Sequence, residues 1–160
     1  MKRLIFTLIA GLLALPVRAE PSGPEVARGW LRAVQAGEAA AIAQTTKLPF
    51  IYREAWPKKQ CDQSVADGDA LGKWTACMQK NERLLLDELK WEKENLTLEA
   101  GEGKSPKKLR ALAKKVAKGE WVHGWINGDG VTYEFLFLMD RASDKPQIAA
   151  CIIDVSFDTD

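Results

Sequence analysis

The last third of the chain alternates between apolar and polar side chains in a way that predicts β-strands. Two alternating segments, residues 121–126 and 131–139, flank Asn127-Gly128-Asp129-Gly130, a sequence typical of hairpin turns. A third segment, 147–157, is mainly apolar and follows the polar loop 140–146. The pattern therefore predicts an antiparallel meander of three strands in this part of the chain.

The first part of the chain is patterned for a helix instead. This helix is predicted to begin at Ser22, because Ser22 and Glu25 have the spacing of a capping box and Pro24 suits a first turn. Gly37 is the residue expected to end it. The apolar positions in between recur at helical spacing and form one stripe: Ala27, Trp30, Leu31 and Val34.

Further elements lie between these two regions. A second helix is expected over 38–45, a short strand at 48–52, and helical structure over 68–92 in one or two pieces. A brief strand is expected at 95–99, followed by a helix that opens at Ser105-Pro106. Helices thus precede the strand meander, which favours an α+β fold with the helices packed on one face of the sheet.

The N-terminal segment has the three parts of a cleavable secretion signal. Lys2 and Arg3 precede an apolar run over 4–17, and Val17-Arg18-Ala19 has suitable residues where a signal peptidase reads. We therefore expect cleavage after Ala19 and export to the bacterial periplasm or the extracellular medium. A membrane-anchoring helix is the alternative, but the run is shorter than the roughly 20 residues of a spanning helix and a proline ends it.

Removal of that segment changes the charge balance. The 160-residue chain has a formal net charge of +1, and the loss of Lys2, Arg3 and Arg18 removes three positive charges and leaves −2. A nearly neutral chain has no global field to attract nucleic acid or an anionic membrane, so neither is an expected partner. No second apolar run could span a bilayer, and residues 20–160 suffice for one domain with one core.

Three cysteines remain after the expected cleavage: Cys61, Cys77 and Cys151. In an oxidising compartment we expect Cys61 and Cys77 to pair, and closing a loop of that size contributes about 3 kcal/mol in the chain-entropy model. Cys151 lies in the apolar segment of the last predicted strand and is expected to be a buried thiol. The chain has no Cys-x-x-Cys sequence and one histidine, so no metal or cofactor is expected.

The predicted hairpin brings that histidine beside a carboxylate. If the chain turns at Gly128-Asp129, His123 lies opposite Glu134. One interpretation is a general acid–base pair, in which the carboxylate fixes the tautomer and raises the basicity of the imidazole. The other is an ordinary ionic pair between strands, which stabilises a sheet by a few tenths to about 1 kcal/mol. The other side of these strands is apolar and carries Val122, Ile126, Val131, Tyr133, Phe135, Phe137 and Met139.

Three more side chains are candidates for a ligand site near that pair. Tyr52, Arg53 and Asp154 could orient a substrate at the mouth of the sheet. Asp154 stands within an apolar strand, and a buried carboxylate needs a partner. The alternative is that Asp154 lies at a solvated end of the sheet.

Two further features, a pair of tryptophans and the basic side of a predicted helix, each have two interpretations. Trp121 and Trp125 fall on the same face as His123 and either line a ligand site or partner surface, or are covered by neighbouring helices. The helix that opens at Ser105-Pro106 has a basic side, which is either a binding patch or the solvated side of a surface helix. Its members are Lys107, Lys108, Arg110, Lys114, Lys115 and Lys118.

A family resemblance follows from the order of these elements. The leading helix with Val26-Ala27-Arg28-Gly29-Trp30-Leu31, its end at Ala36-Gly37-Glu38, the strand Leu48-Pro49-Phe50 and the terminal strands resemble the nuclear transport factor 2-like (ketosteroid-isomerase-like, cystatin-like α+β) superfamily. The resemblance implies a curved antiparallel sheet, or cone, with N-terminal helices packed on it. It is closest to uncharacterised exported bacterial members. The segment 56–118 departs from the plain family pattern.

The resemblance leaves the activity open. Members include isomerases, dehydratases, cyclases, ligand carriers and interaction domains, and relatives often dimerise through the sheet face that here carries Trp121 and Trp125. No local motif matches the catalytic carboxylate or tyrosine of the isomerases, so those roles are not carried over.

One functional expectation and two alternatives result. The expectation is an exported binding or interaction domain without a catalytic motif, with a homodimer, a small apolar ligand or a secreted protein as its partner. The first alternative is a small-molecule isomerase or dehydratase that uses His123 and Glu134 as its acid–base pair. The second is an inhibitor or immunity-type partner of another secreted protein.

Overall fold

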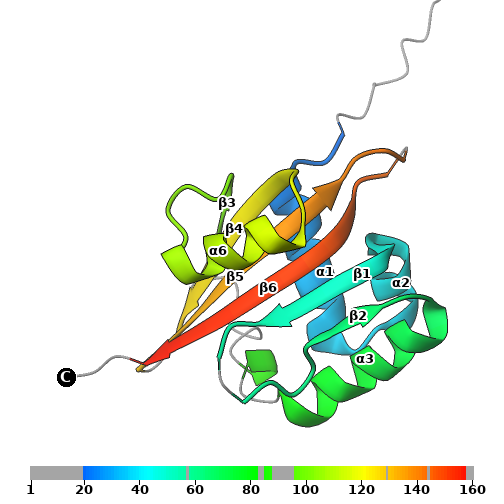
Figure 1. The fold of residues 1–160 in the computed structure, drawn as a ribbon. Helices are drawn as coiled ribbons and strands as arrows, with labels where there is room; N and C mark the ends of the chain where they lie inside the picture. The colour runs from blue at the N-terminus through cyan, green and yellow to red at the C-terminus, as the bar shows by residue number, and fades with distance from the viewer. Residues whose placement is uncertain are drawn as a thin grey trace, which may run out of the picture.

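The computed structural model describes residues 20–56, 58–82, 85–87, 96–128, 130–143 and 145–157, so the expected signal segment lies outside the described residues. Within them the strands form one six-stranded sheet in the order β2-β1-β6-β5-β4-β3, curved and not closed into a barrel (Figure 1). The strands are β1 (Thr46–Glu54), β2 (Gln63–Val65), β3 (Leu96–Ala100), β4 (Glu120–Asn127), β5 (Val131–Asp140) and β6 (Gln147–Phe157). The helices are α1 (Gly23–Ala36), α2 (Ala39–Thr45), α3 (Gly68–Asn81) and α6 (Lys107–Val116). The expected α+β fold is confirmed.

Helix α1 begins and ends where its sequence predicts. The backbone N–H of Glu25 donates to the Ser22 hydroxyl at 3.4 Å, and the Ser22 N–H donates to the Glu25 carboxylate at 2.7 Å, which completes the capping box. Gly37 ends the helix in the left-handed region, with a φ of 68° that glycine adopts without steric penalty.

The first three helices lie on one face of the sheet, which we call the inner face (Figure 1). Trp30 of α1 is the centre of an aromatic cluster there, with ring centroids 5.7 Å from Phe50, 5.6 Å from Trp74 and 5.9 Å from Phe137. The apolar residues predicted for one side of β4 and β5 all pack into this core. They are Val122, Ile126, Tyr133, Phe135, Phe137 and Met139, with Val131 partly buried against them.

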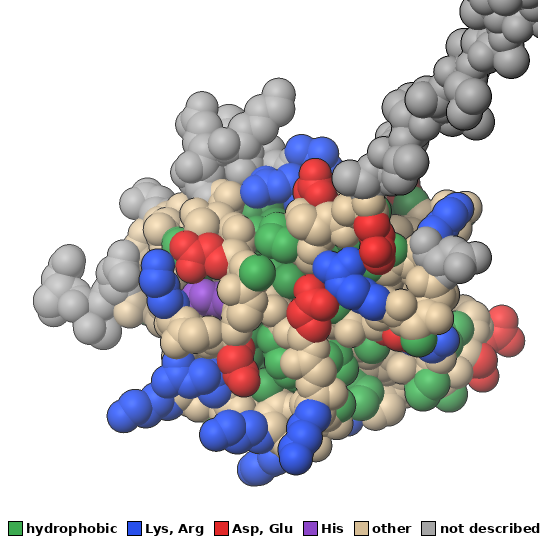
Figure 2. Space-filling view, turned by 90° about the horizontal axis from the view of Figure 1, so that it is seen from above, with side chains coloured by type: hydrophobic (Ala, Val, Ile, Leu, Met, Phe, Trp, Pro, Cys, Tyr) green, Lys and Arg blue, Asp and Glu red, His purple; other side chains and the backbone are tan. Residues whose placement is uncertain are grey.

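Helix α6 lies on the opposite, outer face, so the prediction that all helices share one face is wrong. Leu109 and Ala113 are buried against Trp121 and Leu136 of the outer face. The reason is that the outer face is itself apolar at this place and an amphipathic helix removes it from water. The basic side of α6 faces solvent and forms the row of Lys and Arg side chains along the lower edge of Figure 2.

The sheet is antiparallel except at one pair of neighbours. Strand β6 is antiparallel to β5 but parallel to β1, with Tyr52 opposite Cys151 and Arg53 opposite Ile152. The three-strand meander was predicted correctly, and the parallel neighbour is the feature that local patterns did not indicate.

The β4–β5 register differs by two residues from the predicted one. His123 lies opposite Leu136, and Glu134 lies opposite Trp125. The turn is centred one position later than predicted, because Gly130 takes the left-handed φ of 71° and the Gly128 N–H donates to the Val131 carbonyl at 2.7 Å. A shift of two residues leaves every side chain on its predicted face.

The region predicted as helical over 68–92 breaks at residue 82. Helix α3 ends at Asn81, residues 85–87 are helical again, and 83–84 and 88–95 lie outside the described residues. Cys77 of α3 is bonded to Cys61, with a Cα–Cα distance of 5.9 Å, which confirms the predicted disulfide. Cys151 is the predicted buried thiol. None of the helices in the described ranges is long and apolar enough to cross a membrane.

Candidate functional site

The predicted His123–Glu134 contact is present on the outer face. His123 Nε2 lies 2.6 Å from Glu134 Oε2, a diagonal contact between neighbouring positions of β4 and β5. The side chain of His123 is 5% exposed and that of Glu134 is 22% exposed. The Trp125 ring lies beside the imidazole, with centroids 5.0 Å apart. Figure 2, in which the one histidine is purple, shows acidic and basic side chains next to it.

The other ring nitrogen of His123 has no partner. Nδ1 is buried and makes no hydrogen bond in the described structure. In a neutral imidazole whose Nε2–H donates to the carboxylate, Nδ1 is an acceptor with unused capacity. The pair therefore has the chemistry of a proton acceptor held in one orientation, beside an aromatic ring.

Asp154 and a lysine extend this outer cluster. Asp154 lies opposite Glu134 in the β5–β6 ladder, and its carboxylate accepts from Lys108 Nζ of α6 at 3.0 Å. Both acidic side chains thus lie on the face covered by α6. Asp154 is half-buried and forms an ion pair with Lys108. It is therefore neither fully buried nor simply at a solvated end of the sheet, the two positions considered from the sequence.

The remaining predicted site residues do not join this cluster. Tyr52 is 1% exposed and belongs to the inner-face core. Arg53 is on the outer face, where it donates to Ser64 at 2.9 Å and lies 3.7 Å from Asp62. Trp121 is 5% exposed and covered by α6.

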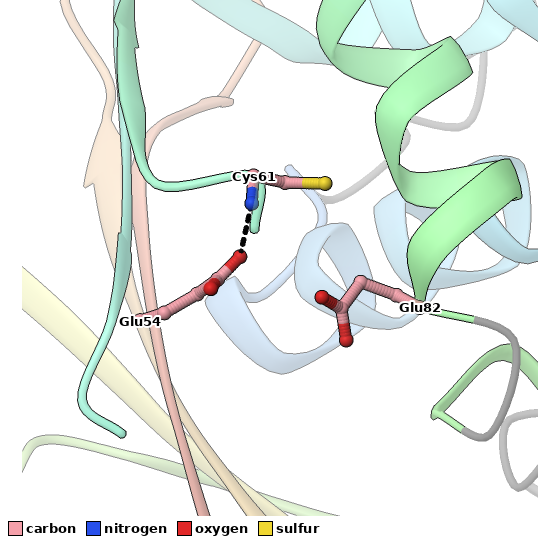
Figure 3. Close-up of side chains that lie close together, drawn as sticks. All are labelled: Glu54, Cys61 and Glu82. Carbon is pink, nitrogen blue, oxygen red and sulfur yellow. Dashed lines mark hydrogen bonds between the residues drawn. The ribbon is translucent and has the colours of Figure 1, made fainter. Parts of the chain in front are cut away.

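A second cluster, which the sequence did not predict, lies at the inner face. Glu54 ends β1, and Glu82 follows α3; their carboxylate oxygens lie within 4.8 Å of one another. Figure 3 shows the two carboxyl groups pointing toward each other from these elements. We call them the inner carboxyl pair.

The two carboxyls of this pair are held differently. Glu54 is fully buried, and its two oxygens accept backbone N–H groups, from Gln60 at 2.6 Å and from Cys61 at 2.7 Å. Glu82 is half-buried, and its Oε1 is buried without a hydrogen-bond partner in the described structure. Glu54 therefore shapes the loop that follows β1, whereas Glu82 has an unused polar atom.

Burial and mutual repulsion shift the protonation of the pair. Burial, and then the neighbouring Glu54 charge, raise the pKa of Glu82 to about 7. Burial also raises the pKa of Glu54, against the lowering effect of its two backbone N–H donors. Glu82 thus exchanges a proton near neutral pH, which is the property of a group that acts as an acid or a base there.

An apolar pocket of about 500 Å³ adjoins Glu82. Three aromatic rings line it, from Trp56, Tyr133 and Phe157, together with the aliphatic side chains of Leu85 and Val155. Its size, and a lining in which Lys58, Gln60, Asn81 and Glu82 stand among apolar walls, are those of small-molecule sites.

Two further buried polar atoms on the inner face are unpartnered in the described structure, the Tyr52 hydroxyl and Trp74 Nε1. Burial of the phenol, more than the nearby charges, raises the pKa of Tyr52 well above its usual range, so the hydroxyl keeps its proton. The Tyr52 ring packs on the Trp74 ring, with centroids 5.3 Å apart. Buried groups that can donate and lack an acceptor are uncommon in folded proteins.

Glu54, Cys61 and Glu82 together have the donor atoms of a small metal site. The Cys61 sulfur, however, is bonded to Cys77 and is no thiolate ligand. The residues present therefore do not fit a metal that needs three protein ligands.

Strand alternation gave a partial signal for this inner cluster. Phe50, Tyr52 and Glu54 occupy every second position of β1 and share the inner face, as the periodicity of a strand requires. Glu82 had no such signal, because nothing local indicates that the end of α3 returns to the end of β1.

Comparison with known proteins adds two structural likenesses. A crystal structure of a ketosteroid isomerase-like protein from Erwinia carotovora atroseptica aligns with 81% of this chain and 90% of that one, at 14% identity and a TM-score of 0.48. A nuclear transport factor 2-like protein from Burkholderia xenovorans aligns over 82% and 86%, at 11% identity and a TM-score of 0.34.

No family model matches the sequence, and no curated protein matches it significantly. The two structural neighbours bear the names of the superfamily that the sequence resembles, but at TM-scores below 0.5 they assign neither an activity nor site residues. What is established is an α+β chain with a curved, open six-stranded sheet and helices packed on it.

Proposed function

We propose that this chain is an exported binding domain whose site is the inner-face pocket. The ligand is a small molecule with an apolar body and one polar group. The observation that carries this proposal is Glu82 Oε1, a buried polar atom without a hydrogen-bond partner among the described residues, beside a pocket of about 500 Å³ with aromatic walls. Burying such an atom without a hydrogen bond costs about 1–3 kcal/mol, which a polar ligand atom would offset.

Two features support export. The N-terminal residues have the pattern of a signal peptide. A disulfide such as Cys61–Cys77 is typical of chains that fold in an oxidising compartment. Native mass spectrometry of protein purified from the periplasm of a bacterial host tests both expectations: the mature chain should begin at Glu20 and contain one disulfide. An uncleaved cytoplasmic product would refute export.

The pocket itself is tested with a neutral apolar dye, Nile red. Wild-type protein should bind the dye and shift its emission to the blue. Val155→Trp, which adds bulk to the pocket wall, should abolish that shift. The matched control is Val116→Trp, which adds the same bulk at the outer face on α6. Equal dye binding by both variants, with cooperative unfolding retained, would refute the pocket as the site.

The second candidate function is a small-molecule enzyme of isomerase or dehydratase type. It is favoured by the 2.6 Å contact between His123 and Glu134 and by the unpartnered Nδ1 of His123. A positioned acid or base contributes about 10²–10⁴-fold to a rate, so His123→Ala should remove at least 100-fold of any turnover while the protein stays folded. Turnover unchanged by His123→Ala would mean that the His123–Glu134 contact is only structural.

A homodimer is a further proposal, with Trp125 as its centre. Trp121 is covered by α6 within the chain, whereas Trp125 is half-buried. Sedimentation at micromolar concentration should show a dimer that Trp125→Lys dissociates. A wild-type monomer at all concentrations would refute it.

A further inference from the structure

We propose that the ligand of the inner-face pocket is an organic cation, a small amine with an apolar body, whose ammonium group is held by the inner carboxyl pair. This inference rests on the proposed binding function and assigns its ligand a chemical class. It draws on three observations: the arrangement of the two carboxyls, the nearby charges, and the walls of the pocket.

Among the described residues, the inner carboxyl pair has no cation in direct contact, and Lys59 acts on Glu54 only at longer range. The oxygens of Glu54 and Glu82 lie within 4.8 Å of one another, and no described lysine or arginine forms an ion pair with either. Two ionised carboxylates this close repel, so one of them takes up a proton unless a cation lies beside them. A ligand ammonium would allow both to stay ionised.

The two lysines that follow Glu54 in the next loop do not play that role. Lys59 pairs with Asp62 at 3.1 Å. Lys58 lines the pocket and is itself exposed, and its carbonyl accepts from Trp56 Nε1 at 2.9 Å. Asp62 is a third carboxylate near Glu54, where it accepts from the Glu54 backbone N–H at 3.0 Å. The charges around the pair thus leave it without a paired cation among the described residues.

The two carboxyls differ in how free their oxygens are to accept a further hydrogen bond. Both oxygens of Glu54 are occupied by the backbone N–H groups of Gln60 and Cys61. Glu82 lines the pocket and has the unpartnered Oε1. The geometry therefore assigns the direct hydrogen bond to Glu82 and a supporting electrostatic role to Glu54.

The walls of the pocket suit the same class of ligand. Trp56, Tyr133 and Phe157 line it, and ring faces attract an ammonium within about 6 Å of their centroids. Leu85 and Val155 provide apolar surface for the body of the molecule. An anionic ligand of the same shape would meet the repulsion of Glu82 and Glu54, which the solvent-exposed Lys58 of the pocket lining offsets only in part.

The test compares three compounds of one shape: phenylbutylamine, phenylbutanol and phenylbutyrate. Affinities are measured by calorimetry at pH 8, and displacement of Nile red verifies that each compound occupies the pocket. We expect the amine to bind at least about tenfold more tightly than the alcohol, and the carboxylate to bind most weakly. The affinity for the amine should rise between pH 6 and pH 8, because ionisation of Glu82 creates its partner.

Glu82→Gln removes the charge and keeps the shape. It should weaken the amine about tenfold, abolish the pH dependence and leave the alcohol within about twofold of wild type. Glu38→Gln, at an exposed position before α2, is the matched control and should change nothing. Glu54 is unsuitable for this test because its oxygens hold the loop backbone.

The possible failures are distinguishable. If the alcohol or the carboxylate displaces Nile red as well as the amine does, the amine class is overturned while the pocket remains a ligand site. The amine class is also overturned if the affinity of wild-type protein for the amine does not change with pH. That measurement does not depend on any variant folding. If Nile red binds but none of the three compounds displaces it, the amine class alone is overturned; if Nile red does not bind either, the proposed binding function falls with it.

Discussion

His123 and Glu134 meet across a diagonal of the β4–β5 ladder, with Nε2 and Oε2 2.6 Å apart, although each residue lies opposite a different neighbour. The contact is possible because residues two positions apart on neighbouring strands remain within reach of long side chains. A prediction that placed the two residues directly opposite one another therefore reached the right contact through a wrong register.

This pair should contribute measurably to stability. His123→Ala leaves a small cavity and an unpaired, mostly buried Glu134, and should lower the free energy of unfolding by about 1–3 kcal/mol. Glu134→Gln should have a smaller effect. Urea unfolding of both single variants and the double variant gives their coupling energy, expected to be about 1 kcal/mol. Additive single effects would mean that the hydrogen bond contributes nothing.

The inner carboxyl pair should make stability depend on pH. The pKa of Glu82 is raised in the folded chain from an ordinary value of 4.5 to about 7, so the folded state binds more protons than the unfolded state between these values. Stability from this group is complete below about pH 4.5 and is lost as the pH rises through about 7. Because Glu82 is half exposed, solvent screening limits the loss to about 1 kcal/mol.

The measurement is chemical unfolding of wild type and Glu82→Gln from pH 4.5 to pH 8. The variant should lack this decline and be the more stable protein at pH 8. A parallel pH dependence in the two proteins would show that Glu82 does not titrate in this window.

Much of the local structure could be predicted from the sequence, because its causes are local. The capping box of Ser22 and Glu25, the left-handed Gly37 and the alternation of β6 each depend on residues near one another. The disulfide was also predictable, since Cys61 and Cys77 are near neighbours in an expected oxidising compartment. These features needed no knowledge of the rest of the fold.

What could not be predicted depends on contacts between distant segments. The parallel pairing of β1 with β6 and the packing of α6 on the outer face have no local cause. The same holds for Glu82 beside Glu54, which come together only because α3 ends next to the end of β1. Of the two candidate clusters, the outer one at His123 and Glu134 was therefore predicted, and the inner one at Glu54 and Glu82 was missed.

Gly124 should resist substitution, because a Cβ there would lie 2.5 Å from Leu98 Cδ2 and 3.4 Å from the Thr97 carbonyl oxygen. Gly124→Ala should cost about 1–2 kcal/mol through overpacking between β3 and β4. Gly72, in the interior of α3, is the matched control: nothing lies within 4 Å of its added Cβ. Gly72→Ala should stabilise by about 0.5–1 kcal/mol, since alanine favours helix.

Thermal unfolding of both glycine variants checks that Gly124→Ala lowers the stability and that Gly72→Ala raises it. Adding Leu98→Ala to Gly124→Ala should recover part of the loss by removing the contacting methyl group. A Gly124→Ala protein as stable as wild type would contradict the close packing of β3 on β4.

Reduction of the disulfide should destabilise the fold by about 3 kcal/mol, the chain-entropy value for a loop of 16 residues. The double variant Cys61→Ala, Cys77→Ala should show the same loss, and its midpoint in urea should not respond to reductant. Cys151→Ala is the control that retains the response to reductant, because Cys151 is a free, buried thiol. A wild-type midpoint unchanged by reductant would contradict the prediction.

The position of β6 has a consequence for the order in which the protein can assemble. This strand follows all the other described strands along the chain, yet it lies inside the sheet and joins β2 and β1 to β5, β4 and β3. Without β6, the described strands β2 and β1 have no hydrogen-bonded link to β5, β4 and β3, so β1 and β5 would each present an open edge. We therefore expect the described sheet to become continuous only after β6 has been synthesised.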